Sequence, residues 1–151
     1  MTASDETVAP ELERLVDAFF DAVSFEPGSQ PAYERIHDLF IDAGLLIRNV
    51  GAAAVPEICG IRQFIDSRQA LVDSGELTRF HEAALAGTTE IFGNVAHRSS
   101  GYVKSGTSKG VPFGANGWIS AQFVRTPHGW RMSSMAWDDE REGLRLPAQY
   151  R

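Results

Sequence analysis

A carboxylate and an imidazole oppose each other across a predicted hairpin, and this pair is the first candidate for acid–base chemistry. Gly93-Asn94 lies between Phe92 and Val95 and is typical of a two-residue turn with glycine first. Pairing outward from that turn places Glu90 directly opposite His97. A carboxylate that holds one ring nitrogen raises the basicity of the other, so His97 would act as a general base oriented by Glu90. The alternative is an exposed ion pair worth well under ~1 kcal/mol.

Two further residues extend this candidate catalytic site. Gly87 halfway along the strand indicates a bulge, and one inserted residue brings His81 onto the face of Glu90 and His97. Those three side chains form the donor set of a two-histidine, one-carboxylate metal site, but the segment lacks the second histidine of a helical zinc motif. We therefore expect neither a metal nor a cofactor. Asp138 ends an apolar strand face, where burial would raise its pKa; a plain turn-forming aspartate is the alternative.

A second hairpin indicates a core face and an interface face. Residues 125–130 carry Pro and Gly between two alternating runs, and we pair Arg125 with Trp130. The pairs expected on the core face are Phe123/Met132, Ala121/Ser134, Ile119/Ala136 and Gly117/Asp138. The pairs expected on the other face are Val124/Arg131, Gln122/Ser133, Ser120/Met135, Trp118/Trp137 and Asn116/Asp139. The second face mixes large apolar with polar side chains, which predicts a dimer interface formed by Trp118, Gln122, Met135 and Trp137.

The elements that position these residues follow from periodicity. Residues 77–140 predict three long strands joined by two tight turns, because their apolar residues alternate. The first half of the chain predicts three helices: a long one with an apolar stripe from Leu12 to Val23, a short one after Pro31, and a third over residues 61–73. Residues 45–50 predict a first strand, and residues 57–59 a minor one.

Length and composition exclude several classes of protein. The 151-residue chain suits a single domain, with an ordered core at about residues 8–140 and a tail at residues 141–151. Cys59 is the only cysteine, which favours the reducing cytoplasm, and we expect it to be a buried structural thiol. No run approaches the roughly 20 apolar residues of a membrane span. A net charge of −6 without clustered Lys or Arg argues against a nucleic-acid partner.

The order of these elements resembles the nuclear transport factor two-like superfamily, also described as SnoaL-like or cystatin-like. The segments that carry the resemblance are residues 12–20, residues 92–97, and residues 129–140. The resemblance implies an α+β fold in which a strongly curved antiparallel sheet forms a cone-shaped half-barrel covered by the three helices. It also implies a pocket inside the cone and a homodimer formed through the sheet. For the pocket lining we expect Phe19, Phe20, Arg48, Phe64, Phe123, Trp130 and Met132.

The known members include isomerases, cyclases, dehydratases and non-enzymatic adaptors. Where the steroid isomerases carry a tyrosine and two acids, this chain offers Phe19 or Phe20, residues 47–49, and Ala121. The cyclases and dehydratases use a His/Asp set, for which His81, His97 and Asp138 are the candidates here. The sequence thus predicts a cytoplasmic homodimer that binds a small hydrophobic or carbonyl compound, with Asp138 or Arg48 steadying an enolate. The alternative is a non-catalytic binding or assembly module with a filled pocket.

Overall fold

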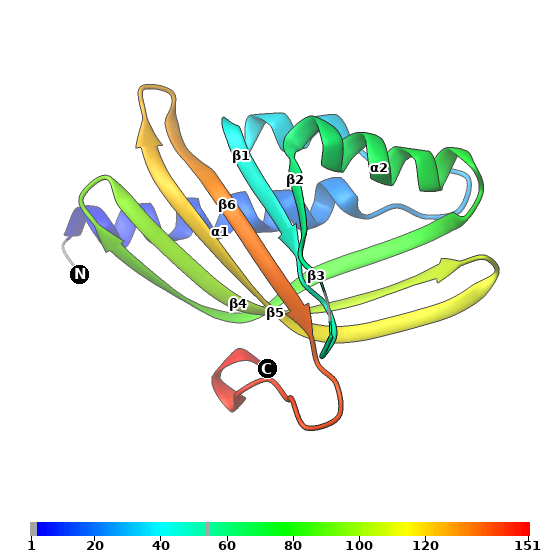
Figure 1. Ribbon diagram of the computed structural model, residues 1–151. Coiled ribbons are helices and arrows are strands. Elements are labelled where there is room, and N and C mark those ends of the chain that lie inside the picture. The colour runs from blue at the N-terminus through cyan, green and yellow to red at the C-terminus, as the bar shows by residue number, and fades with distance from the viewer. Residues whose placement is uncertain (1–2, 54) are drawn as a thin grey trace.

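One curved sheet with helices on its inner side forms the molecule, as the computed structural model shows for residues 3–53 and 55–151 (Figure 1). The elements in chain order are α1 (Ala3–Val23), the 3-10 helix η1 (Tyr33–Asp38), β1 (Phe40–Arg48), β2 (Glu57–Gly60), α2 (Ile61–Asp73), β3 (Leu77–Phe92), β4 (Val95–Ser108), β5 (Val111–Thr126), β6 (Gly129–Asp139) and the 3-10 helix η2 (Ala148–Tyr150). The strand order is β2-β1-β6-β5-β4-β3. The predicted α+β class and the helical cover of the sheet are confirmed.

The helices pack through the apolar stripes that the sequence predicts. Helix α2 has the predicted boundaries, Ile61–Asp73, and buries Phe64 and Ile65. Helix α1 buries the stripe that runs from Leu12 to Val23. The sheet curves around α1, and α2 lies over the end that carries β1 and β2 (Figure 1). No helix in the described part of the chain is long and apolar enough to cross a membrane.

The strand count and one pairing differ from the prediction. Residues 77–140 form four strands, because a further turn at Lys109-Gly110 has both residues in the left-handed region, with φ of 51° and 76°. Lys-Gly lacks the Asn or Asp that usually signals such a turn. Strand β1 begins at Phe40, five residues earlier than expected, and pairs with β6 in parallel. The sheet is therefore mixed and not fully antiparallel.

A bulge in β6 overturns most of the predicted register of the second hairpin. Arg125 pairs with Trp130 as predicted, but Gln122 pairs with Ser134, so Ser133 is an extra residue on β6. Because side chains alternate faces, one inserted residue moves every later side chain of β6 to the opposite face. Asp138 consequently pairs with Trp118 on the outer face.

Because of the same bulge, two of the expected interface residues are on the inner face, and their prediction was wrong. Met135 is only 1% exposed and belongs to the core, while Trp137 contacts Phe64 of α2 inside the cone. Trp118 and Gln122 lie exposed on the outer face, where their role in an interface remains a prediction.

The first hairpin agrees with the sequence more closely. Gly93 has a φ of +58°, and Glu90 pairs with His97. Two residues of β3 between Ala84 and Gly87 oppose one residue of β4, so the expected bulge is present. His81 consequently shares a face with Glu90 and His97, and this is the outer face.

Residues 141–151, expected as a tail, pack against the outer face of the sheet. Leu146 is buried, and the Tyr150 ring lies 6.1 Å from the Trp118 ring in an edge-on contact. A side chain at Gly101 would overlap the Tyr150 carbonyl oxygen, so glycine allows this close approach. The segment therefore covers part of the surface that we expected to form the dimer.

Candidate functional site

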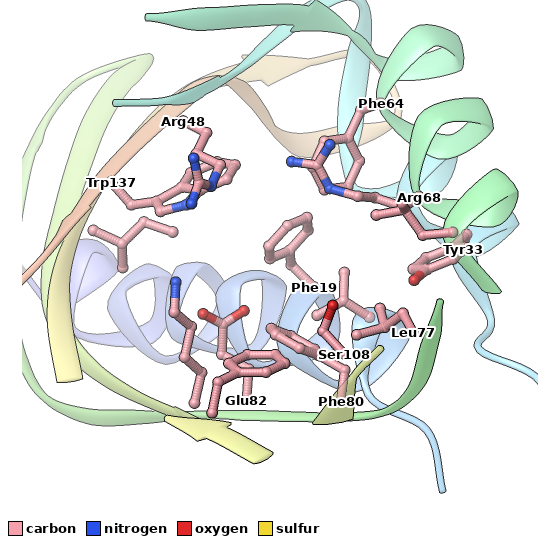
Figure 2. Close-up of a pocket in the computed structure, with 15 residues that line it drawn as sticks. Phe19, Tyr33, Arg48, Phe64, Arg68, Leu77, Phe80, Glu82, Ser108 and Trp137 are labelled. Carbon is pink, nitrogen blue, oxygen red and sulfur yellow. The ribbon is translucent and has the colours of Figure 1, made fainter. Parts of the chain in front are cut away.

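A cavity of about 250 Å³ opens inside the cone between α1, α2 and the sheet (Figure 2). Most of its wall is aliphatic or aromatic, and its charged side chains come from β1, α2, β3 and β4. The lining residues are Phe19, Val23, Tyr33, Arg48, Phe64, Arg68, Leu71, Leu77, Phe80, Glu82, Lys104, Ser108, Phe113, Ile119 and Trp137.

Three of the expected pocket residues line this cavity, namely Phe19, Arg48 and Phe64. The other four do not line it and belong to the buried core, namely Phe20, Phe123, Trp130 and Met132. Phe123, Trp130 and Met132 lie near the turn between β5 and β6, whereas Arg48 and Trp137 of the cavity are partners near the opposite end of β6. The cone is therefore packed at one end and hollow at the other.

Four side chains from three strands form a polar cluster at the floor of the cavity. Glu82 on β3 and Lys104 on β4 are cross-strand partners. The Lys104 Nζ lies 2.9 Å from Asp139 Oδ1, and the Tyr102 hydroxyl donates a hydrogen bond to the same oxygen. Within the described residues the Glu82 carboxylate has neither an ion pair nor a hydrogen bond. Glu82 is thus the free acid of the cluster and faces the cavity.

Burial sets the protonation of this cluster. It raises the pKa of Glu82 to about 7; nearby Lys104 opposes the rise and Asp139 adds to it. Burial and the hydrogen bond to Asp139 raise the pKa of the Tyr102 phenol, which therefore stays protonated. Near neutral pH Glu82 is then able both to accept and to donate a proton.

Tyr102 reaches Asp139 because Gly117 leaves room for its ring. Tyr102 and Gly117 are cross-strand partners on β4 and β5, and Tyr102 is fully buried. A side chain at Gly117 would overlap the Tyr102 hydroxyl. This close approach places the phenol beside Asp139 and fixes the carboxylate that holds Lys104.

The opposite side of the cavity is basic. Figure 2 shows Arg48 beside Trp137 and Arg68 beside Phe64, with Glu82 across the cavity from both. The Arg68 guanidinium lies 4.5 Å from the Phe64 ring centre and donates a hydrogen bond of 2.8 Å to Glu57. That hydrogen bond lowers the pKa of the Glu57 carboxyl.

The predicted catalytic residues lie elsewhere. His97 Nε2 is 3.1 Å from Glu90 Oε1, so the pairing is present, but the side chains are 42% and 81% exposed on the outer face. His81 is also exposed there. No group of three metal-ligating side chains occurs among the described residues.

Asp138 was expected at the rim of the core face with a raised pKa, and the bulge makes both expectations wrong. Its carboxylate accepts hydrogen bonds from the Gly51 N–H at 3.1 Å and from Arg141 at 2.8 Å. Burial favours a higher pKa, but these donors outweigh it, and the pKa of Asp138 is lowered. Asp139 takes the inner position instead.

Sequence reasoning missed Glu82, Lys104, Tyr102 and Asp139. A signal existed for three of them, because the bulge at Gly87 that moves His81 outward also moves Glu82 to the inner face. There it pairs with Lys104, two residues beyond Tyr102 on the same face. Asp139 had no comparable signal, since no glycine or proline accompanies the bulge at Ser133.

Comparisons with known proteins identify the fold. No family model and no curated protein matches the sequence. The Kfla4162 protein from Kribbella flavida is 16% identical, with a TM-score of 0.72 over 91% of this chain and 93% of that one. A nuclear transport factor 2-like superfamily protein from Salmonella enterica is 14% identical, with a TM-score of 0.73 over 91% and 94%. The association domain of CaMKII from C. elegans is 13% identical, with a TM-score of 0.65 over 90% and 98%.

Proposed function

We propose that this chain, which has the nuclear transport factor 2-like fold, binds a small carbonyl compound in the cone and transfers a proton at the carbon next to the carbonyl. Cyclisation, isomerisation and dehydration all use this step. The observation that carries the proposal is Glu82, a carboxyl with a pKa raised to about 7 that faces an otherwise largely apolar cavity. A general base works best when its pKa lies near the operating pH.

In this mechanism Glu82 removes the proton and Lys104 steadies the enolate. Lys104 also lines the cavity, and its ammonium is held in place by Asp139. A fixed cation beside developing negative charge lowers the barrier because it needs no reorganisation during the reaction. Tyr102 keeps Asp139 oriented and is a positioning residue.

The proposal moves the proton-transfer role from His97 to Glu82. His97 and Glu90 project from the outer face of β4 and β3, whereas the cavity lies on the inner face. Asp138 or Arg48 was expected to steady the enolate. Asp138 lies on the outer face, and Arg48 lines the cavity on the side opposite Glu82, so we assign this role to Lys104.

Hydrogen–deuterium exchange tests the reaction directly. A panel of small ketones and oxo acids is incubated with the protein in D₂O, and loss of the α-hydrogen signal is followed by NMR. We expect faster exchange with the wild type, and a Glu82→Gln variant slower by about 100-fold or more. His97→Gln should match the wild type. Exchange that is equally fast with Glu82→Gln contradicts the proposed role of Glu82.

A second candidate function is assembly. The CaMKII association domain has the same fold, and Trp118 and Gln122 are exposed on the outer face of this chain. We propose a homodimer through this face, in the cytoplasm. Sedimentation of a Trp118→Ser, Gln122→Glu variant should then show a monomer, and an unchanged boundary would place the contact elsewhere.

A further inference from the structure

We infer that the cavity takes a small monocarboxylic acid with a flat apolar body. Its carboxylate lies between Arg48 and Arg68, and its far end reaches toward Glu82. The inference rests on the proposed function, because it names the ligand class of the same cavity.

The charge of the cavity is opposite to that of the protein. Three cationic side chains line it, Arg48, Arg68 and Lys104, against one carboxylate, Glu82. The whole chain carries a net charge of −6. A basic cavity in an acidic protein favours an anionic ligand over a neutral or cationic one.

Two of these cations are in ion pairs with acids, and Arg48 is not. Lys104 is paired with Asp139 at 2.9 Å, and Arg68 with Glu57 at 2.8 Å. In the part of the chain that the structure describes, Arg48 makes neither an ion pair nor a hydrogen bond. Glu57 is the cross-strand partner of Arg48 and also the ion-pair partner of Arg68. The two arginines therefore share one carboxylate, and the positive charge left over matches a ligand with a single negative charge.

Unused donors of the two arginines face the same cavity (Figure 2). Arg68 uses one terminal nitrogen, Nη1, for Glu57 and Ser67, and its other terminal nitrogen makes no hydrogen bond to the described residues. Both arginines are close enough to Glu57 to lower its pKa. Guanidinium groups bind carboxylates through paired N–H donors, so this geometry suits a carboxylate between them.

Tyr33 supplies one more donor at this wall. It lines the cavity and is 4% exposed, and burial raises its pKa to about 12 while Arg68 opposes the rise. The phenol is therefore protonated at neutral pH and can donate to an anion.

The remaining wall and the size of the cavity describe the rest of the ligand. Phe19, Phe64, Phe80 and Trp137 surround the space between the arginines and Glu82 (Figure 2). Aromatic walls favour a flat, apolar body. A cavity volume of about 250 Å³ is below the roughly 300–1,000 Å³ of sites for drug-sized ligands. The apolar part of the ligand should therefore be about the size of one aromatic ring.

A dianion fits this site less well than a monoanion. A phosphonate would bring a second negative charge that finds no uncompensated cation in the cavity, and it would increase repulsion of the Glu82 carboxylate. The choice between carboxylate and phosphonate is therefore part of the test.

Calorimetric titration with three probes of the same body tests the ligand class. Phenylacetate, neutral phenylacetamide and benzylphosphonate are titrated into the full chain at about pH 8.5, where the phosphonate is a dianion. We expect phenylacetate to bind at least tenfold more tightly than the other two. Equal binding of the amide, tighter binding of the phosphonate, or no binding of phenylacetate at millimolar concentration overturns the inference.

Substitutions of the two arginines test where the carboxylate of the ligand binds. Arg48→Met should weaken phenylacetate binding about tenfold or more, and Arg68→Lys, which keeps the charge but loses the fork, should weaken it less. The matched control is Arg62→Met on the same helix as Arg68, because Arg62 is exposed and paired with Glu34 and Asp66 outside the cavity. Phenylacetate binding that is unchanged in Arg48→Met overturns the inference.

Glu82→Gln separates this inference from the proposed reaction. Binding that depends on Arg48, together with a lack of proton exchange on any substrate, upholds the ligand class and contradicts the reaction. If proton exchange depends on Glu82 but phenylacetate binding is the same in Arg48→Met, the reaction is upheld and the ligand class is contradicted.

Discussion

Strands β3 and β4 carry two acid–base pairs that differ mainly in the face from which they project. Glu90 and His97 are cross-strand partners on the outer face, and Glu82 and Lys104 are cross-strand partners on the inner face. The outer pair is in direct contact but exposed to water, which screens it. The inner carboxylate has no direct partner, yet burial raises its pKa to about 7. Desolvation, more than the contact between acid and base, prepares a group for proton transfer.

Breaking the ion pair between Lys104 and Asp139 on the inner face should produce the largest effect. Lys104→Met leaves the Asp139 carboxylate, which is 15% exposed, without its cation. Removal of one partner of a buried pair costs about 3–5 kcal/mol, so the free energy of unfolding should fall by that order. Urea denaturation measures it, and Lys104→Met with Asp139→Asn should recover part of the loss. A loss below ~1 kcal/mol would mean that water reaches Asp139.

The stability of the protein should depend on pH through Glu82. The pKa of Glu82 rises from 4.5 to about 7 on folding, so between these values the folded state holds a proton that the unfolded state has lost. The stability contributed by protonated Glu82 is complete below pH 4.5 and declines as the pH rises to 7, by at most about 3 kcal/mol.

Denaturation at pH 5 and pH 7.5 measures this decline. Glu82→Gln should remove it, whereas Glu90→Gln should retain it. An identical decline in the wild type and in Glu82→Gln would show that another group titrates.

The fit between Tyr102 and Gly117 should give an intermediate effect. Gly117→Ala introduces a carbon that overlaps the Tyr102 hydroxyl, and overpacking of this kind costs about 1–3 kcal/mol. Gly114→Ala on the same strand is the control, because its new carbon would lie 3.3 Å from the nearest atom, the Lys104 carbonyl oxygen. Thermal unfolding compares the two, and equal stability would mean that Tyr102 moves freely.

Removing the ion pair between Glu90 and His97 on the outer face should have the smallest effect on stability and activity. Glu90→Gln removes an ion pair whose side chains are 81% and 42% exposed, and such pairs contribute about 0–1 kcal/mol. The free energy of unfolding and the exchange activity should both stay close to the wild type. A large loss of activity would return the catalytic role to the outer face.

Local signals located the helices and most of the turns, although α1 begins at Ala3, before the ordered core expected from about residue 8. The apolar period of 3.6 located α2 to the residue, and Gly93-Asn94 and residues 125–130 located two turns. Lys109-Gly110 was missed because strand-like residues continue on both sides of it. The parallel pairing of β1 with β6 joins distant segments, so no local pattern could indicate it.

The candidate site depended on two bulges, and only one of them has a sequence signal. Gly87 marked the bulge in β3, which places Glu82 on the inner face. The bulge at Ser133 lies between ordinary strand residues, and tertiary packing selects it. A prediction without that bulge assigns Asp138, Met135 and Trp137 to the wrong faces, although it names the right strands.

The parallel pairing of β1 and β6 also has a consequence for the order of folding. It joins residues 40–48 to residues 132–137, whereas β3 to β6 are connected by two-residue turns. Distant pairings pay a larger loop-closure entropy and form more slowly than hairpins. The strand that carries Arg48 should therefore dock onto a meander that is already formed. In a refolding experiment, recovery of the cavity should lag behind the formation of the sheet.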